Sequence, residues 1–130
     1  MVIDSSALIA IVTEEPESAY FLSLIHQADS IRISAATFLE TGMVLKRDST
    51  GKHRSVFENL ILRLPVPIVP VSEEQARIAL DAFDRYGKGR GHPAGLNFGD
   101  CFSYALAKIG DEPLLFKGRD FKYTDIQAAG

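Results

Sequence analysis

Cysteine and histidine are scarce in this sequence, which contains one cysteine and three histidines. None of them stands at the spacing of a metal-binding motif, and the single thiol of Cys101 cannot form an intrachain disulfide. No apolar run is long enough to cross a membrane, and no basic segment followed by a cleavage site opens the chain as in a signal peptide. We therefore expect a cytoplasmic protein that does not reside in a membrane.

Excess positive charge is also absent, because the formal net charge of the 130 residues is −3. A protein that coats nucleic acid through charge alone is normally basic, so this class is disfavoured. A nuclease whose metal neutralises its own acids stays compatible with this charge. Hydrophobic residues make up 46% of the chain, which suits one globular domain with its own core, and we expect that domain to span residues 1–130.

Short apolar segments alternate with helical patterns along the chain. The predicted strands are residues 1–4, 31–34, 68–71 and 113–116. The predicted helices are residues 5–12, 16–28, 37–47, 56–64, 72–86 and 97–109. Strands that alternate with helices form a parallel sheet covered on both faces. The sequence therefore predicts an α/β fold, in which a short parallel β-sheet of about four to five strands is flanked by helices on both faces.

Acidic residues follow predicted strands or open predicted helices at four places: Asp4, Glu40, Asp100 and Asp120. The carboxyl ends of parallel strands meet at one edge of a sheet, so we expect these carboxylates to converge. Converging carboxylates repel one another unless a cation holds them, and oxygen ligands favour Mg²⁺ or Mn²⁺ over zinc. We predict Asp4 and Asp100 as direct ligands, and Glu40 as a ligand through water or as a general base.

Each acid also has a purely structural explanation. Asp4 could cap the helix that follows it. Glu40 lies three residues after Thr37, and Asp100 lies three residues after Asn97, which is the spacing of a capping box. Capping and metal binding do not exclude each other, because a cap at the sheet edge would still deliver its carboxylate to the common site.

The fourth acid has a competitor in the sequence. Asp120 lies in a turn after the last predicted strand, where aspartate is common, and Asp125 five residues later could take its place. Ser6 could donate a hydrogen bond to one of the carboxylates, although capping or contact with solvent is the more common explanation for a serine at this place.

Four segments resemble the PIN-domain family, and more narrowly the VapC-type toxins of bacterial toxin–antitoxin pairs. They are residues 2–8, 36–41, 96–102 and 114–121, in the family's order along nearly the whole chain. The resemblance implies a single PIN-like domain with Mg²⁺- or Mn²⁺-dependent endoribonuclease activity, homodimerisation and neutralisation by a cognate VapB-type antitoxin. Transfer or ribosomal RNA is the substrate class that the family suggests.

The family's acidic residues fall on Asp4, Glu40, Asp100 and Asp120, which the resemblance implies are catalytic. Many relatives carry an acid two places earlier in the last motif, where this chain has Gly118. Either Asp120 takes over that role, or the site works with three acids and a polar fourth group.

Three other functions are considered beside the nuclease. A phosphoacceptor domain needs an aspartate at the end of the middle strand, where Val71 stands, and a phosphatase of the haloacid dehalogenase type needs an acid where Ser6 stands. A catalytically inert PIN-like protein-binding module, whose acids only cap helices, is the remaining alternative. The glycine-rich loop of residues 87–95 lacks the ending of a P-loop, but its Lys88 and Arg90 could bind RNA phosphates.

Overall fold

The computed structural model describes residues 1–130 and confirms the predicted alternation of strands and helices. Its strands are β1 (Val2–Ile3), β2 (Ile33–Ser34), β3 (Ile68–Val69) and β4 (Leu114–Leu115). Its helices are α1 (Ser5–Val12), α2 (Ser18–Gln27), α3 (Ala35–Leu45), α4 (Lys52–Arg63), α5 (Glu73–Tyr86), α6 (Phe98–Ile109) and the 3₁₀ helix η1 (Asp120–Tyr123).

All strand pairs are parallel, as the sequence predicted. β1 pairs with β4 and β2 pairs with β3, and an isolated bridge between Val2 and Arg32 connects the two pairs. The order across the molecule is therefore β3, β2, β1, β4, and Ala128 adds a further bridge beside Leu114 at the outer edge. The strands are only two residues long because Pro70 cannot continue the ladder after β3, while α1 and α3 begin almost at once after β1 and β2.

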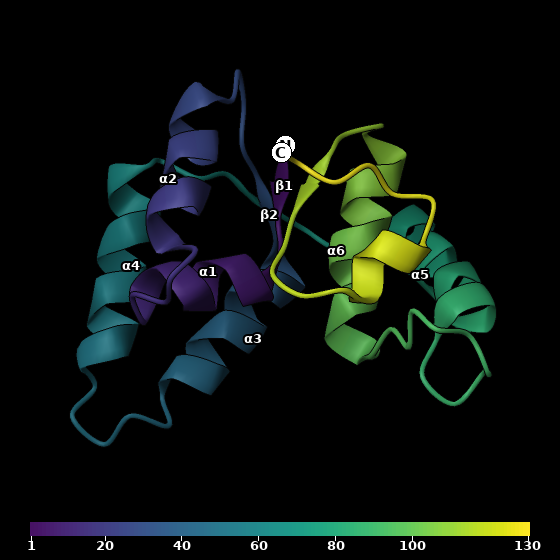
Figure 1. Ribbon diagram of the computed structural model, residues 1–130, viewed down its shortest axis with the longest axis horizontal. Coiled ribbons are helices and arrows are strands. Elements are labelled where there is room, and N and C mark those ends of the chain that lie inside the picture. The colour runs from purple at the N-terminus through teal and green to yellow at the C-terminus, as the bar shows by residue number, and fades with distance from the viewer.

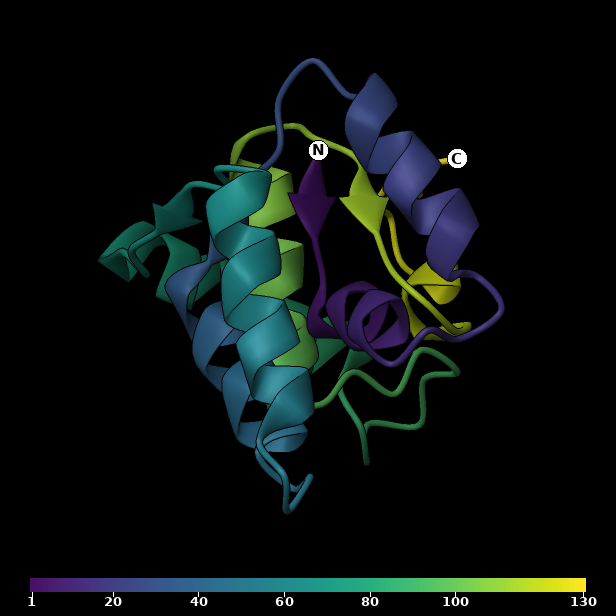
Figure 2. The same cartoon turned by 90° about the vertical axis from the view of Figure 1, so that its left-hand side faces the viewer.

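The strands lie between α1 to α4 on one side and α5 and α6 on the other (Figure 1), and the hydrophobic core falls into two clusters. Ile3 and Leu115 face the cluster under α1 to α4, whereas their neighbours Val2 and Leu114 face the cluster under α5 and α6. This alternation is the two-residue period of a strand. Figure 2, turned by 90°, shows β1 and β4 between the helices. Helices therefore cover both faces of the sheet, as predicted.

Three helix starts differ from the sequence prediction by two residues or more. α2 begins at Ser18 rather than at Pro16, which lies in the turn before the helix. α3 begins two residues before Thr37, because the side chain of Ser34 accepts a hydrogen bond from the backbone N–H of Ala36 at 3.2 Å. α4 begins at Lys52 rather than Val56, after Gly51 adopts a left-handed φ of +71° that turns the chain into the helix. The capping-box interpretation of Thr37 and Glu40 is therefore wrong.

No helix combines the length and the apolar character that crossing a bilayer would require. Cys101 is buried and belongs to the core cluster under α5 and α6.

Candidate active site at the carboxyl edge of the sheet

Asp4 is the most firmly held acid of the site. It ends β1, caps α1 and is only 2% exposed. Its Oδ2 accepts hydrogen bonds from the backbone N–H of Ser6 at 3.0 Å and from the Ser6 hydroxyl at 2.7 Å. Its Oδ1 accepts a 2.5 Å hydrogen bond from the hydroxyl of Ser103 on α6. Three donors therefore fix the plane of this carboxylate.

Ser6 connects Asp4 with the segment after β4. Its hydroxyl oxygen accepts a 3.0 Å hydrogen bond from the backbone N–H of Lys117 while its proton is donated to Asp4. The ammonium of Lys117 in turn pairs with Glu15 and Glu17 in the connection between α1 and α2. Ser6 therefore does donate to a carboxylate, which the sequence allowed but did not favour, and it joins the ends of the paired strands β1 and β4.

Asp100 lies in the first turn of α6 and forms the capping box that the sequence predicted. Asn97 Oδ1 accepts from the Asp100 N–H at 2.9 Å, and Asp100 Oδ2 accepts from the Asn97 N–H at 3.0 Å. Burial raises the pKa of the Asp100 carboxyl from 3.8 to about 7, with a further contribution from the negative charges of Asp4, Asp120 and Glu40. The charges of the other three acids singled out in the sequence therefore reach Asp100.

Glu40 lies inside α3, one turn beyond the capped end of the helix. Its carboxylate packs against the backbone of Gly99, immediately before Asp100, so closely that a Cβ atom at position 99 would overlap it. Glycine at this position is thus what allows α3 and α6 to bring Glu40 beside the start of α6.

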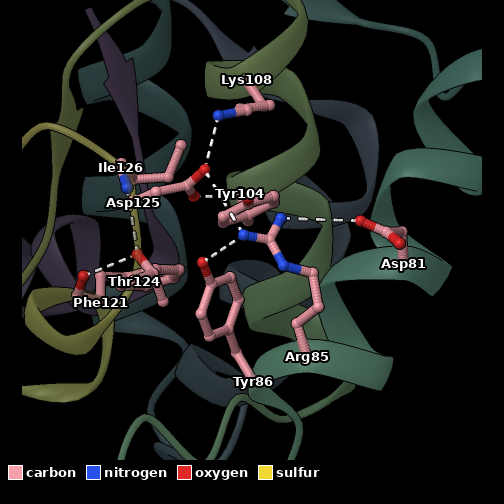
Figure 3. A network of polar contacts seen from close by, with 9 residues as sticks. All are labelled: Asp81, Arg85, Tyr86, Tyr104, Lys108, Phe121, Thr124, Asp125 and Ile126. Atoms are coloured by element: carbon pink, nitrogen blue, oxygen red, sulfur yellow. Dashed lines mark hydrogen bonds and ion pairs between the residues drawn. The ribbon is translucent and has the colours of Figure 1, made fainter.

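Asp125 does not join this group of acids. Its carboxylate accepts hydrogen bonds of 2.6 Å from the Tyr104 hydroxyl and of 2.6 Å from Lys108 Nζ, and lies 3.9 Å from Arg85 (Figure 3). Burial opposes ionisation of Asp125, but the bonds from Lys108 and Tyr104 outweigh it and lower its pKa. Asp120, at the start of η1, is the acid of this segment whose charge acts on Asp100.

The distances between the acids decide whether they can bind a cation in the positions that their side chains have in this structure. No three carboxylate, imidazole or thiol groups lie close enough together in this arrangement to hold a metal ion. The chemistry of the group nevertheless suits one, since Asp100 is partly buried beside three further acids and only backbone and hydroxyl donors oppose their charge. A hard divalent cation is the partner that such oxygen donors favour.

An apolar cleft of about 900 Å³ opens beside Glu40, between α3 and the start of α6. Leu39, Met43 and Phe98 line it and are 62%, 65% and 80% exposed. Arg47 is the basic residue of its lining. An apolar surface this accessible next to an acidic site is a typical place for a macromolecular partner.

The two basic residues predicted to contact RNA lie in the exposed loop between α5 and α6. Lys88 projects from the loop, and Arg90 pairs weakly with Asp84 on α5 at 4.0 Å. The backbone N–H of Lys88 donates a 2.8 Å hydrogen bond to the carbonyl oxygen of Leu96, and this bond closes the loop at its base.

Ser103 is the residue of the site that the sequence analysis missed. It follows Asp100 by one helical turn, which could have placed it on the same face of α6. A serine inside an apolar helical stretch gives no sign of a partner that lies 99 positions away in the sequence.

Comparison with known proteins agrees with this architecture. The PIN domain family profile matches residues 1–127. Ribonuclease VapC28 of Mycobacterium tuberculosis is 46% identical over 129 residues, which cover 99% of this chain and 97% of the relative. Ribonuclease VapC of Mycolicibacterium smegmatis is 44% identical over 128 residues and 98% of both chains.

Solved structures share the fold at much lower sequence identity. The Mycobacterium tuberculosis toxin VapC20, described as cleaving the sarcin–ricin loop, superposes with a TM-score of 0.74 at 17% identity over 96% of this chain and 95% of that one. FitAcB from Neisseria gonorrhoeae gives a TM-score of 0.70 at 17% identity, over 99% and 96%. From the sequence relatives and the family profile together, the protein belongs to the PIN-domain family, among the VapC ribonucleases.

Proposed function

We propose that this protein is an endoribonuclease, the toxin of a type II toxin–antitoxin pair, and that it cuts cellular RNA with the help of Mg²⁺ or Mn²⁺. The observation that carries the proposal is the placement of Asp100 near the negative charges of Asp4, Glu40 and Asp120 at the carboxyl edge of a parallel sheet. The names of its relatives, at more than 40% identity over nearly the full chain, support the same reaction.

Asp4 and Asp100 are the residues proposed to hold the cation. When bound, a divalent cation lowers the pKa of a water molecule and neutralises charge on the phosphate. Asp4 suits a ligand because three hydrogen bonds already fix its carboxylate. Asp100 suits a ligand because a nearby positive charge would favour its ionised form.

The other two acids have separate proposed roles. Glu40 approaches from α3, and its carboxylate can accept the proton of a water that attacks the scissile phosphate. Asp120 comes from the segment after β4 and contributes negative charge near Asp100. Hydrolysis forms a bond from the water oxygen to phosphorus and breaks the bond to the leaving ribose oxygen, which must gain a proton.

The inert protein-binding module fits these observations less well. A helix cap needs no second acid. Asp100 nevertheless lies near three other acids, whose charges add to burial in raising its pKa to about 7. Glu40 does not cap a helix at all, because Ser34 caps α3. An arrangement that costs stability without serving the fold is characteristic of a functional site.

Lys88 and Arg90 are the residues proposed to contact RNA. The proposed substrate is transfer or ribosomal RNA, and the proposed location of the reaction is the cytoplasm. Exposed cations in the loop between α5 and α6 would bind backbone phosphates without reading sequence. Replacing Lys88 and Arg90 together by alanine should weaken RNA binding severalfold at low salt and leave Mn²⁺ binding unchanged. Equal RNA affinity of the variant and the wild type in a low-salt filter-binding assay would contradict this role.

A VapB-type antitoxin is the proposed protein partner, and the cleft beside Glu40 is the proposed place for it. An apolar segment of the antitoxin would cover Leu39, Met43 and Phe98, and would thereby keep RNA away from the acids. Leu39→Asp should reduce antitoxin affinity while RNA cleavage by the free toxin persists. Homodimerisation remains a prediction, which light scattering on the free protein would test.

Cleavage of total small RNA with and without Mn²⁺ tests the main proposal. The wild type should give discrete fragments only with the metal, and an Asp4→Asn/Asp100→Asn variant should give none. Asp29→Asn, the same chemical change at an exposed position, is the matched control and should cut normally. Equal cutting by the double variant would refute the proposed roles, and a wild type that neither cuts nor binds Mn²⁺ would favour the inert module.

A further inference from the structure

Two buried hydroxyl groups link the elements that carry three of the acids. The Ser103 hydroxyl on α6 donates to Asp4 Oδ1 at 2.5 Å, and the Thr37 hydroxyl on α3 lies 3.2 Å from the same Ser103 oxygen. Ser103 is 0% exposed, Thr37 is 1% exposed and Asp4 is 2% exposed. No solvent therefore competes for these hydrogen bonds.

The direction of both bonds follows from the protons available. An ionised carboxylate can only accept, so Ser103 must give its single hydroxyl proton to Asp4. Ser103 has no other proton left for Thr37, and Thr37 must therefore donate to Ser103. The result is a directed chain from Thr37 through Ser103 to Asp4, in which each bond polarises the next.

Each of the two hydroxyl residues lies one helical turn from an acid on its own helix. Thr37 precedes Glu40 by three residues on α3, and Ser103 follows Asp100 by three residues on α6. Residues three apart lie on the same face of a helix, one turn from each other. The chain of hydroxyls thus joins α3, α6 and the end of β1 within one helical turn of Glu40 and Asp100.

We propose that Ser103 and Thr37 are positioning residues that fix how Asp4, Glu40 and Asp100 stand relative to one another. The inference rests on the proposed nuclease function, because the positions of these acids matter for cation binding and cleavage. Ser103 sets the orientation of the Asp4 carboxylate directly. Thr37 acts through Ser103, by holding its hydroxyl in the rotamer that donates to Asp4.

A purely structural role would predict a different outcome, and Thr41 separates the two. Thr41 lies on the same helix as Thr37 and is 0% exposed, but its hydroxyl donates to the backbone carbonyl of Thr37 at 2.7 Å rather than to the site. Thr37→Val and Thr41→Val therefore remove the same hydroxyl, with the same change of shape, from equally buried positions. Only the first breaks the chain to Asp4.

The experiment compares full-length Thr37→Val, Ser103→Ala and Thr41→Val with the wild type. Four quantities are measured: the free energy of unfolding in urea, the Mn²⁺ concentration that half-saturates the metal-dependent rise in Tm, and kcat and KM on a cleaved RNA. Loss of a residue that orients a ligand commonly lowers metal affinity or activity about 10- to 100-fold. Ser103→Cys keeps the size of the side chain with a weaker donor, and replaces Ser103→Ala if the latter does not fold.

Ser103→Ala should lower kcat and weaken Mn²⁺ binding about 10-fold or more with KM little changed. Thr37→Val should change both in the same direction but less, and Thr41→Val should match the wild type in both. The Thr37→Val/Ser103→Ala variant should be no worse than Ser103→Ala, because Thr37 acts through Ser103.

Wild-type kcat and Mn²⁺ affinity in Ser103→Ala, or equal losses in Thr41→Val and Thr37→Val, would overturn the inference alone. A wild type that neither cleaves RNA nor binds Mn²⁺ would refute the proposed function, and this inference with it.

Discussion

Replacing Asp100 by asparagine should stabilise the cation-free protein at alkaline pH while it abolishes RNA cleavage. The carboxyl group of Asp100 has a pKa of about 7 in the folded protein, against an ordinary value of 3.8. Between these two values the folded protein keeps a proton that the unfolded chain releases. The unfolded state binds fewer protons there, so the free energy of unfolding falls as the pH rises from about 4 to about 7.

The size of the effect follows from the pKa difference. Each pKa unit corresponds to 1.36 kcal/mol, so the full difference gives an upper limit of about 4 kcal/mol at pH 8.5. Part of this limit is lost because Asp100 is not fully buried, and we expect a gain of about 2 kcal/mol for Asp100→Asn. The amide oxygen of asparagine can still accept from the Asn97 N–H, so the capping box persists.

Urea unfolding in EDTA at pH 8.5 and pH 4.5 measures this gain. Asp100→Asn should be more stable than the wild type at pH 8.5, and most of the difference should vanish at pH 4.5. Saturating Mn²⁺ should reverse the order, because a cation that binds the native acids stabilises the wild type more. Asp29→Asn should differ little from the wild type throughout.

A gain of the same size at both pH values would show that Asp100→Asn acts through packing rather than through charge. No gain at pH 8.5 would refute the raised pKa itself. Either result would remove the electrostatic conflict from which the cation site is argued.

Two further substitutions test the packing around the site. Gly99→Ala should displace the Glu40 carboxylate and lower kcat at least 10-fold. Gly42→Ala is the control and should cut RNA normally, because a Cβ atom at position 42 would lie 4.0 Å from its nearest neighbouring atom. Equal activity of both variants would show that Glu40 has room to move. Asp125→Asn removes the charge that pairs with Lys108 and should destabilise the protein at pH 7. The loss should be only about 1 kcal/mol, because solvent screens this partly exposed carboxylate. Because the pKa of Asp125 is lowered, this loss of stability should disappear as the pH falls below about 4. Asp81→Asn, which removes a single exposed ion pair, is the control and should lose less stability in thermal unfolding.

Local signals in the sequence predicted the parts of the site that depend on neighbouring residues. Asp4 after a buried strand and Asn97 three residues before Asp100 both form the caps that their spacing indicated. Parallel strands then bring these caps to one edge, which is why four acids distant in the sequence could be grouped before any contact was known. The fold class follows from the same alternation of strands and helices.

Contacts between distant elements decided what the sequence could not predict. In the sequence, Thr37 fits the first position of a capping box as well as Ser34 fits an N-cap. Only the way in which β2 leads directly into α3 makes Ser34 the N-cap residue. Asp125 is directed away from the acids because Tyr104 and Lys108 bind it from α6. Ser103 has the least local signal of all, since its partner on β1 comes beside it through the packing of the sheet.

The pairing of β1 with β4 has a consequence for the cell that makes this chain. Val2 lies beside Leu114, and the acids at the strand ends run from Asp4 to Asp120. A ribosome produces the first strand at once but its partner only near the end, and contacts so distant in sequence form late. A truncated product of interrupted translation lacks β4 and Asp120, so an unfinished chain lacks both the partner strand of β1 and the last of the four acids proposed for the site.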